Sequence, residues 1–85
     1  MDILRAEQRI LHLLAQGGRI DLVRGEAGEL TDAQCYSRDG WHYTGLDMDL
    51  FCKLKRRRTI ASRGGQPYRI TRRGLQLVRS QPDNF

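Results

Sequence analysis

The sequence lacks the features by which exported and membrane-spanning proteins are recognised. Its first ten residues, MDILRAEQRI, contain no basic leader followed by an apolar block and a small-residue cleavage site. Nowhere do about 18 apolar residues run together, the length that a membrane-spanning helix needs. We therefore expect a cytoplasmic protein that is neither secreted nor inserted in a membrane.

Cysteine is scarce, and the residue spacing that builds metal sites is absent. Cys35 and Cys52 are the two cysteines, and a lone pair in an unexported chain is expected to remain as thiols. With His12 and His42 they make four potential zinc ligands, but no C-x-x-C or H-x-x-x-H spacing joins them. We expect no metal site and no other cofactor.

No constellation for catalysis stands out either. A nucleophile needs a base within hydrogen-bond reach and an oriented third partner, and the sequence supplies no such set. The segment Arg63-Gly64-Gly65 lacks the further glycine, lysine and hydroxyl of a phosphate-binding P-loop. The sequence predicts a protein that is not an enzyme and that acts by binding.

The chain has few prolines and is short. Two prolines, 39% hydrophobic residues and 29% charged residues suit a folded protein rather than a disordered one. Its 85 residues leave room for one modest core, so we expect a single domain over residues 1–80 and a loose tail over 81–85. Dimerisation would help so small a core, which keeps a homodimer open.

Charge is divided unevenly along the chain. Residues 1–45 carry five Arg against seven Asp or Glu, and residues 46–85 carry ten Lys or Arg against three Asp, so the halves have net charges of −2 and +7. Such a field attracts polyanions or acidic protein surfaces without saying which. A merely solvated basic face is the alternative.

Hydrophobic periodicity predicts the elements of the first half. Residues 3–16 form an amphipathic pattern that should end at Gly17-Gly18. Residues 19–36 alternate on either side of a turn at 25–28, which predicts a β-hairpin. Residues 41–43 are typical of a short strand whose two aromatic residues, Trp41 and Tyr43, lie in the core with His42 packed between them.

The second half predicts a basic helix followed by a hairpin and another helix. Residues 46–57 place four apolar residues on one arc, with Asp near the start and Lys or Arg near the end, as the helix dipole favours. Beyond it, Arg57 and Arg58 would turn toward the apolar arc, so the helix must fray or both side chains must extend outward. Strands at 59–62 and 68–70 flank a glycine loop at 63–67, and Thr71 can cap a last helix over 71–79.

This order is that of winged helix-turn-helix domains, in which the basic helix enters a DNA groove and the hairpin, or wing, lies over phosphate. The motif Y-x-I-T-x-x-G at residues 68–74 also occurs where the wing meets the last helix in bacterial proteins of this class. A typical domain has another helix where this chain has a hairpin. The predicted fold class is therefore α+β, a small winged helix-turn-helix-like domain with an inserted N-terminal β-hairpin.

The candidate binding residues for nucleic acid or a protein partner lie on the basic helix and in the wing. On the predicted solvent face of the helix, Met48 and Cys52 suit a protein groove, and Asp49 would repel phosphate. The cations suit backbone contact better than base reading, although they could also serve only for solubility. The candidate residues are Met48, Cys52, Lys53, Lys55, Arg56, Arg57, Arg58 and Arg63.

Four phrases spread over nearly the whole chain, EQRILHLLAQGGRI, CYSRDG, LFCKLKRRRTI and GQPYRITRRGL, resemble the YjhX toxin family, also called TopAI. The resemblance implies a toxin of a bacterial toxin–antitoxin system that binds and inhibits DNA topoisomerase I and is neutralised by a cognate antitoxin. It assigns no inhibitory residues.

The leading hypothesis is that the basic helix and the wing bind topoisomerase I, its DNA backbone, or both, and block relaxation by occlusion. The alternative is a winged-helix DNA-binding transcriptional regulator, which the predicted layout alone would favour. A small enzyme is a third reading, and it would require a turnover that depends on His42 or Cys52.

Overall fold

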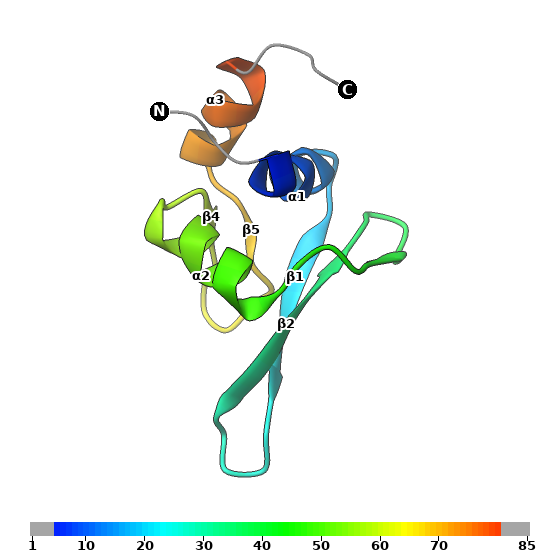
Figure 1. Ribbon diagram of the computed structural model, residues 1–85, viewed down its shortest axis with the longest axis vertical. Helices are drawn as coiled ribbons and strands as arrows, with labels where there is room; N and C mark the ends of the chain where they lie inside the picture. Colours follow the sequence, from blue (N-terminus) through cyan, green and yellow to red (C-terminus); the bar gives the residue numbers. More distant parts are fainter. Residues whose placement is uncertain (1–4, 81–85) are drawn as a thin grey trace.

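The computed structural model describes residues 5–80 and has the α+β architecture that the sequence predicts. Three helices and two small antiparallel sheets alternate along the chain (Figure 1). In order, the elements are α1 (Arg5–Ala15), β1 (Arg19–Arg24), β2 (Leu30–Tyr36), β3 (His42–Tyr43), α2 (Met48–Arg56), β4 (Ile60–Ala61), β5 (Arg69–Ile70) and α3 (Arg72–Ser80). The predicted loose tail at 81–85 and the first residues of the predicted helix lie outside the described residues.

Helix α1 ends where the sequence predicts. Gly17 has a φ of +103°, a conformation that glycine adopts without steric cost, and its N–H donates to the carbonyl of Leu14. The apolar side of the helix buries Ile10, Leu11 and Leu14. No helix among the described residues is long and apolar enough to cross a membrane.

The predicted hairpin is formed by β1 and β2. The register pairs Arg19 with Tyr36 and Leu22 with Ala33, and it shifts between Val23 and Arg24 at a bulge. The half of the hairpin near its turn projects away from the three helices (Figure 1). It therefore forms an arm attached to the domain by its base.

The predicted core position of Trp41 is wrong. The strand β3 contains only His42–Tyr43, and Trp41 lies before it in a turn with 76% of its surface exposed. The backbone N–H of Trp41 donates to Ser37 Oγ at 3.0 Å, which holds this turn. Tyr43 packs on the core, whereas His42 is exposed and lies against the ring of Tyr36 with 5.2 Å between centroids. Pairing of β2 with β3 begins only at His42, so Trp41 is not part of the strand and its indole stays in solvent.

Helix α2 is the predicted basic helix. Asp47 caps its N-terminus, since Oδ1 accepts from the N–H of Leu50 at 2.8 Å. Its apolar side buries Leu50, Phe51 and Leu54. The helix ends at Arg56. Arg57, its C-terminal cap, keeps a helical φ of −79° and donates its N–H to the carbonyl of Lys53, so the chain leaves the helical path only at Arg58, whose φ is 62°.

Strands β4 and β5 form the predicted hairpin directly after α2, with Ile60 paired to Ile70. At its tip, Gly64 and Gly65 both have positive φ, 56° and 78°, which lets the chain reverse direction. Thr71 caps α3, because its Oγ1 accepts from the N–H of Gly74 at 3.1 Å. The two sheets meet where Ile20 and Tyr68 exchange backbone hydrogen bonds of 3.0 and 2.9 Å.

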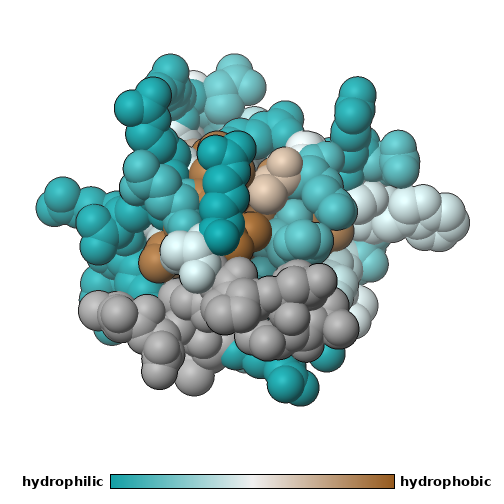
Figure 2. Space-filling view, turned by 90° about the horizontal axis from the view of Figure 1, so that it is seen from above, coloured by the Kyte–Doolittle hydropathy of each residue, from teal (hydrophilic) through white to brown (hydrophobic). Residues whose placement is uncertain are grey.

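One hydrophobic core joins these elements. Phe51 is 1% exposed and meets the ring of Tyr68 edge-on, with centroids 5.1 Å apart. Seen from the end that carries α1 and α3, mostly hydrophilic side chains surround a small apolar centre (Figure 2). The buried apolar residues are Ile10, Leu11, Leu14, Ile20, Ala33, Cys35, Leu46, Leu50, Phe51, Leu54 and Ile60.

Candidate functional site

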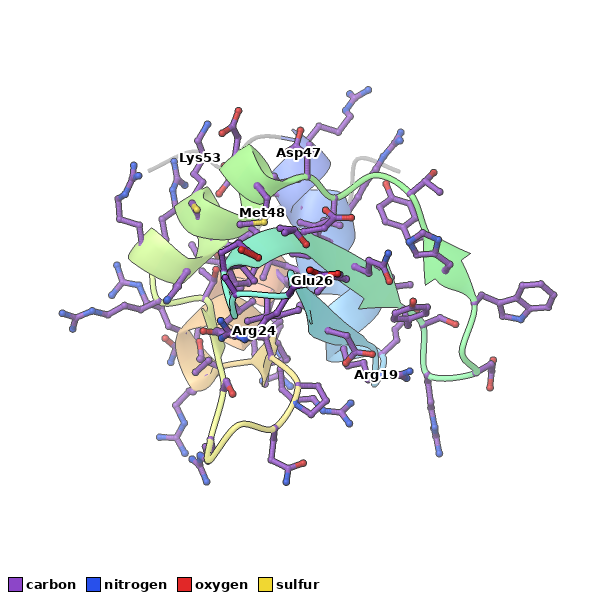
Figure 3. The ribbon with its side chains drawn as sticks, turned by 90° about the horizontal axis from the view of Figure 1, so that it is seen from below. Arg19, Arg24, Glu26, Asp47, Met48 and Lys53 are labelled. Atoms are coloured by element: carbon purple, nitrogen blue, oxygen red, sulfur yellow. The ribbon has the colours of Figure 1, made fainter. Side chains whose placement is uncertain are left out.

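The residues predicted to bind a partner do not share one environment. Five are exposed and extend from the middle of α2 to the tip of the β4–β5 hairpin: Cys52, Lys55, Arg56, Arg58 and Arg63. We call these five the basic surface. Three are half-buried: Met48, Lys53 and Arg57. Figure 3 shows Asp47, Met48 and Lys53 along α2, with Lys53 pointing outward.

Met48 does not lie on an open solvent face. It is half-buried and packs against the hydrophobic core. As the first residue of α2, it follows the capping Asp47 and turns toward the domain rather than away from it. The exposed side of α2 therefore combines Asp49 and Cys52 with two cations, Lys55 and Arg56.

Arg57 has a structural role that the sequence does not indicate. Its Nε lies 3.5 Å from Oε2 of Glu7, whose side chain is 1% exposed. A carboxylate so deeply buried is costly unless it is paired, and Arg57 supplies a charge partner from the C-terminal cap of α2. The ion pair ties α1 to α2, so Arg57 is less available to a partner than its neighbours.

Arg58 has a backbone conformation that residues with a Cβ atom adopt only at a steric cost. Its φ is 62°, the left-handed region that glycine adopts most easily. The surrounding bonds hold it there: its N–H donates to Lys55, and its carbonyl accepts from Thr71 Oγ1 at 2.7 Å. The exposed Arg58 side chain is thus present on a strained backbone. Strained backbone of this kind is often found at binding sites.

Replacing Arg58 by glycine is expected to stabilise the domain. Relief of the left-handed strain should raise the free energy of unfolding by about 1 kcal/mol, and the melting temperature by about 4–8 °C. Thermal unfolding followed by circular dichroism measures this. If Arg58 binds a partner, the same variant should bind more weakly despite its greater stability. A melting temperature that falls would contradict the strain argument.

The cations of the second half are largely uncompensated. Of its ten Lys and Arg residues, Arg57 is the one that forms an ion pair with a carboxylate within residues 5–80. The described acidic residues of this half are Asp47 and Asp49, both at the start of α2. From β4 to the end of α3, this half therefore contributes positive charge and no acidic side chain of its own.

The two cysteines differ in chemical availability. Cys35 is fully buried, and burial raises the pKa of its thiol to about 11. Cys52 is exposed on α2, at one end of the basic surface. Both are free thiols, as the sequence predicts. Cys52 is thus a chemical handle on the candidate site.

Treating the native protein with a bulky maleimide near pH 7.5 should modify Cys52 and leave Cys35 intact, because the buried thiol is almost wholly protonated there. Mass spectrometry of the intact protein should show one added group, and a Cys52→Ser variant should show none. If α2 contacts a partner, the labelled protein should lose binding while unlabelled Cys52→Ser keeps it. Equal labelling of both thiols would contradict the burial of Cys35.

Sequence reasoning missed two arginines that the fold brings to Arg63. Arg69 on β5 and Arg72 at the start of α3 line a cleft of about 540 Å³ together with Arg63. The remaining lining residues are Ala61, Gln66, Pro67, Ile70 and Thr71. Eight residues lie between Arg63 and Arg72 in the sequence, and only the reversal of the hairpin places both on one cleft. We call this the arginine cleft.

The histidines and cysteines do not assemble a metal site in the part of the chain that the structure describes. His12 on α1 is half-buried. Its Nε2 lies 3.5 Å from the amide nitrogen of Gln16.

Comparison with known proteins assigns the chain to a family. Residues 1–85 match a family described as "Putative toxin of bacterial toxin-antitoxin pair". A UPF0386 protein of Hyphomonas neptunium is 89% identical, and UPF0386 proteins of Chelativorans sp. and Rhizobium rhizogenes are 64% and 63% identical, each over 99% of both chains. No solved structure matches. A toxin of such a pair has an antitoxin as its partner. The chain belongs to the YjhX toxin family.

Proposed function

We propose that this protein inhibits DNA topoisomerase I by binding the enzyme, its DNA, or both, through the basic surface, and that it acts by occlusion rather than catalysis. The observation that carries the proposal is the run of exposed, uncompensated cations from α2 to the β4–β5 hairpin. The family's description as a toxin supports a macromolecular target inside the cell. The choice of topoisomerase I rests on the resemblance of the sequence to inhibitors of that enzyme.

Electrostatics supports a target of opposite charge. Lys55, Arg56 and Arg58 follow one another closely along the chain and are all exposed. Their fields add, so an approaching polyanion or acidic surface is attracted over roughly one Debye length, about 8 Å at physiological salt. A nucleic-acid backbone and an acidic protein patch both satisfy this requirement.

The composition of the α2 face favours contact with protein as well. Cys52 is a small, weakly polar group between charged neighbours, and Asp49 on the same helix would be repelled by phosphate. A surface that only followed a DNA backbone would gain nothing from either residue. We propose that α2 contacts the enzyme while the β4–β5 hairpin faces DNA, and that the antitoxin neutralises the toxin by covering α2.

A relaxation assay tests this function. Purified topoisomerase I is incubated with supercoiled plasmid and increasing amounts of the toxin, and topoisomers are resolved by gel electrophoresis. The proposal predicts that plasmid stays supercoiled at excess toxin and that added antitoxin restores relaxation. Full relaxation at every toxin concentration would refute it.

One observation favours a second function, that of a winged-helix DNA-binding regulator. The β4–β5 hairpin follows the basic helix α2 directly in the sequence. The backbone pairing of Ile20 with Tyr68 places β1 beside this hairpin. This is the element order of winged-helix regulators, although β2 and β3 stand where those domains have a helix. Protection of the promoter of the protein's own operon in a footprinting experiment would favour this function over inhibition.

A further inference from the structure

The arginine cleft is a cationic concavity of the described chain. Arg63, Arg69 and Arg72 contribute to its lining, and none of its lining residues is acidic. All three arginines are exposed, and none of them forms an ion pair with a carboxylate of residues 5–80. Three like charges around one cleft repel each other, and a bound anion would attract all three and so offset that repulsion.

Arg69 is held in place before any ligand arrives. One of its terminal nitrogens, Nη1, donates to the carbonyls of Gly17 and Gly18, each at 3.2 Å. The rest of the guanidinium retains donors, because the group carries five N–H bonds in a rigid plane. An arginine fixed through one nitrogen loses less side-chain entropy when it binds an anion through the others.

Arg72 stands where the helix dipole disfavours a cation. It is the first residue of α3, Arg73 follows it, and the first turn contains no acidic residue. A positive side chain at a helix N-terminus destabilises the helix, whereas an acidic one would stabilise it. The sequence thus tolerates an unfavourable local charge beside the cleft, which a bound anion would offset.

The donor set selects the chemical class of that anion. Guanidinium groups match the oxygens of phosphate in paired hydrogen bonds, and they are the preferred partners of phosphodiesters in proteins. The neutral lining, with Gln66, Pro67 and Ala61, adds no charge that would exclude a sugar–phosphate chain passing through. The hydroxyl of Thr71 is engaged by Arg58 and Gly74, so arginines supply the charged donors.

We propose that the arginine cleft binds a backbone phosphate of nucleic acid, with Arg63 and Arg72 as direct contacts and Arg69 as a pre-positioned third. The inference rests on the nucleic-acid part of the proposed function and deepens it. It places the contact with DNA on the side of the β4–β5 hairpin where α3 begins. Free inorganic phosphate shares the same chemistry and is the alternative source that the test must separate.

The test compares Arg72→Gln and Arg63→Gln with a matched control, Arg73→Gln, which removes the same charge from a neighbouring exposed position that does not line the cleft. Binding of a short fluorescein-labelled DNA duplex to the full chain is measured by anisotropy over a range of KCl. Each cleft variant should lower the slope of log affinity against log salt by about 1 and weaken binding several-fold. Arg73→Gln should keep the wild-type slope. Equal losses for Arg72→Gln and Arg73→Gln would overturn the site.

A second measurement on the unaltered protein separates the two phosphate sources. Titration with the DNA duplex, followed by ¹H–¹⁵N spectra, should shift the side-chain Nε–H signals of Arg69 and Arg72. Shifts with inorganic phosphate but not with DNA would overturn the nucleic-acid assignment.

Loss of DNA binding in the cleft variants supports the site even if the toxin does not inhibit plasmid relaxation by topoisomerase I. Unchanged DNA binding in those variants refutes the site even where wild-type toxin inhibits the enzyme.

Discussion

Reversing Lys55 and Arg56 to glutamate is expected to abolish inhibition of topoisomerase I. Both side chains are exposed at the end of α2, so the double change alters charge without disturbing the core. Two attractions become two repulsions, which weakens binding to an anionic surface by at least about 2 to 3 kcal/mol, on the order of 100-fold in affinity. Plasmid relaxation with the variant in place of the wild-type toxin measures the effect.

Arg5→Glu/Arg9→Glu is the matched control for that experiment. It introduces the same change in net charge at two exposed positions of α1, outside the basic surface. We expect it to inhibit nearly as well as the wild type, because local rather than overall charge guides binding at physiological salt. Equal loss in both double variants would mean that net charge alone is responsible, and the assignment of α2 would fail.

Replacing Arg57 by methionine is expected to destabilise the domain severely. Glu7 would keep its buried carboxylate and lose the cation 3.5 Å away. Breaking a buried ion pair by removing one partner costs about 3–5 kcal/mol, a large part of the total stability of a small domain. Urea unfolding followed by circular dichroism should show a much lower midpoint, or no folded baseline.

The control for this prediction removes both charges. In Glu7→Leu/Arg57→Met both members of the ion pair are replaced by apolar residues, so most of the lost stability should return. The exposed neighbour Arg56→Met should cost less than about 0.5 kcal/mol. If Arg57→Met and Arg56→Met unfold at the same urea concentration, the ion pair does not contribute to stability as described.

Local chemistry was enough to predict much of the fold. The glycines after α1, the alternating pattern of residues 19–36 and the acidic start and basic end of α2 each act over a few residues, and the elements form as those patterns indicate. Thr71 is a cap for the same reason. Such signals need no knowledge of which elements meet in space.

The remaining features depend on contacts between segments that are distant in sequence. No local pattern in the sequence predicts that Glu7 is buried. Its burial is explained by the ion pair with Arg57, which lies at the end of α2, far from Glu7 in the sequence. Trp41 looks like a core residue, yet pairing of β2 with β3 begins at His42 and leaves the indole outside. A sequence pattern predicts burial from the average preference of each residue type. Glu7 and Trp41 depart from that average because of contacts made in the tertiary structure.

The candidate site divides in the same way. The cations of α2 and Arg63 could be identified from the sequence because they cluster along the chain and the predicted helix displays them. Arg69 and Arg72 could not be assigned, since their proximity to Arg63 depends on the reversal at Gly64-Gly65 and on the capped turn at Thr71. One local signal was present: arginine at the first helical positions, where the dipole favours acids.

The central claim is that opposite charge holds the toxin on its target, and the salt dependence of affinity tests it most directly. The equilibrium affinity of the wild-type toxin for a topoisomerase I–DNA complex is measured between about 50 and 200 mM KCl. For roughly four ionic contacts with backbone phosphate, affinity should fall on the order of 100-fold over that range. An affinity that stays constant across the titration would contradict the account.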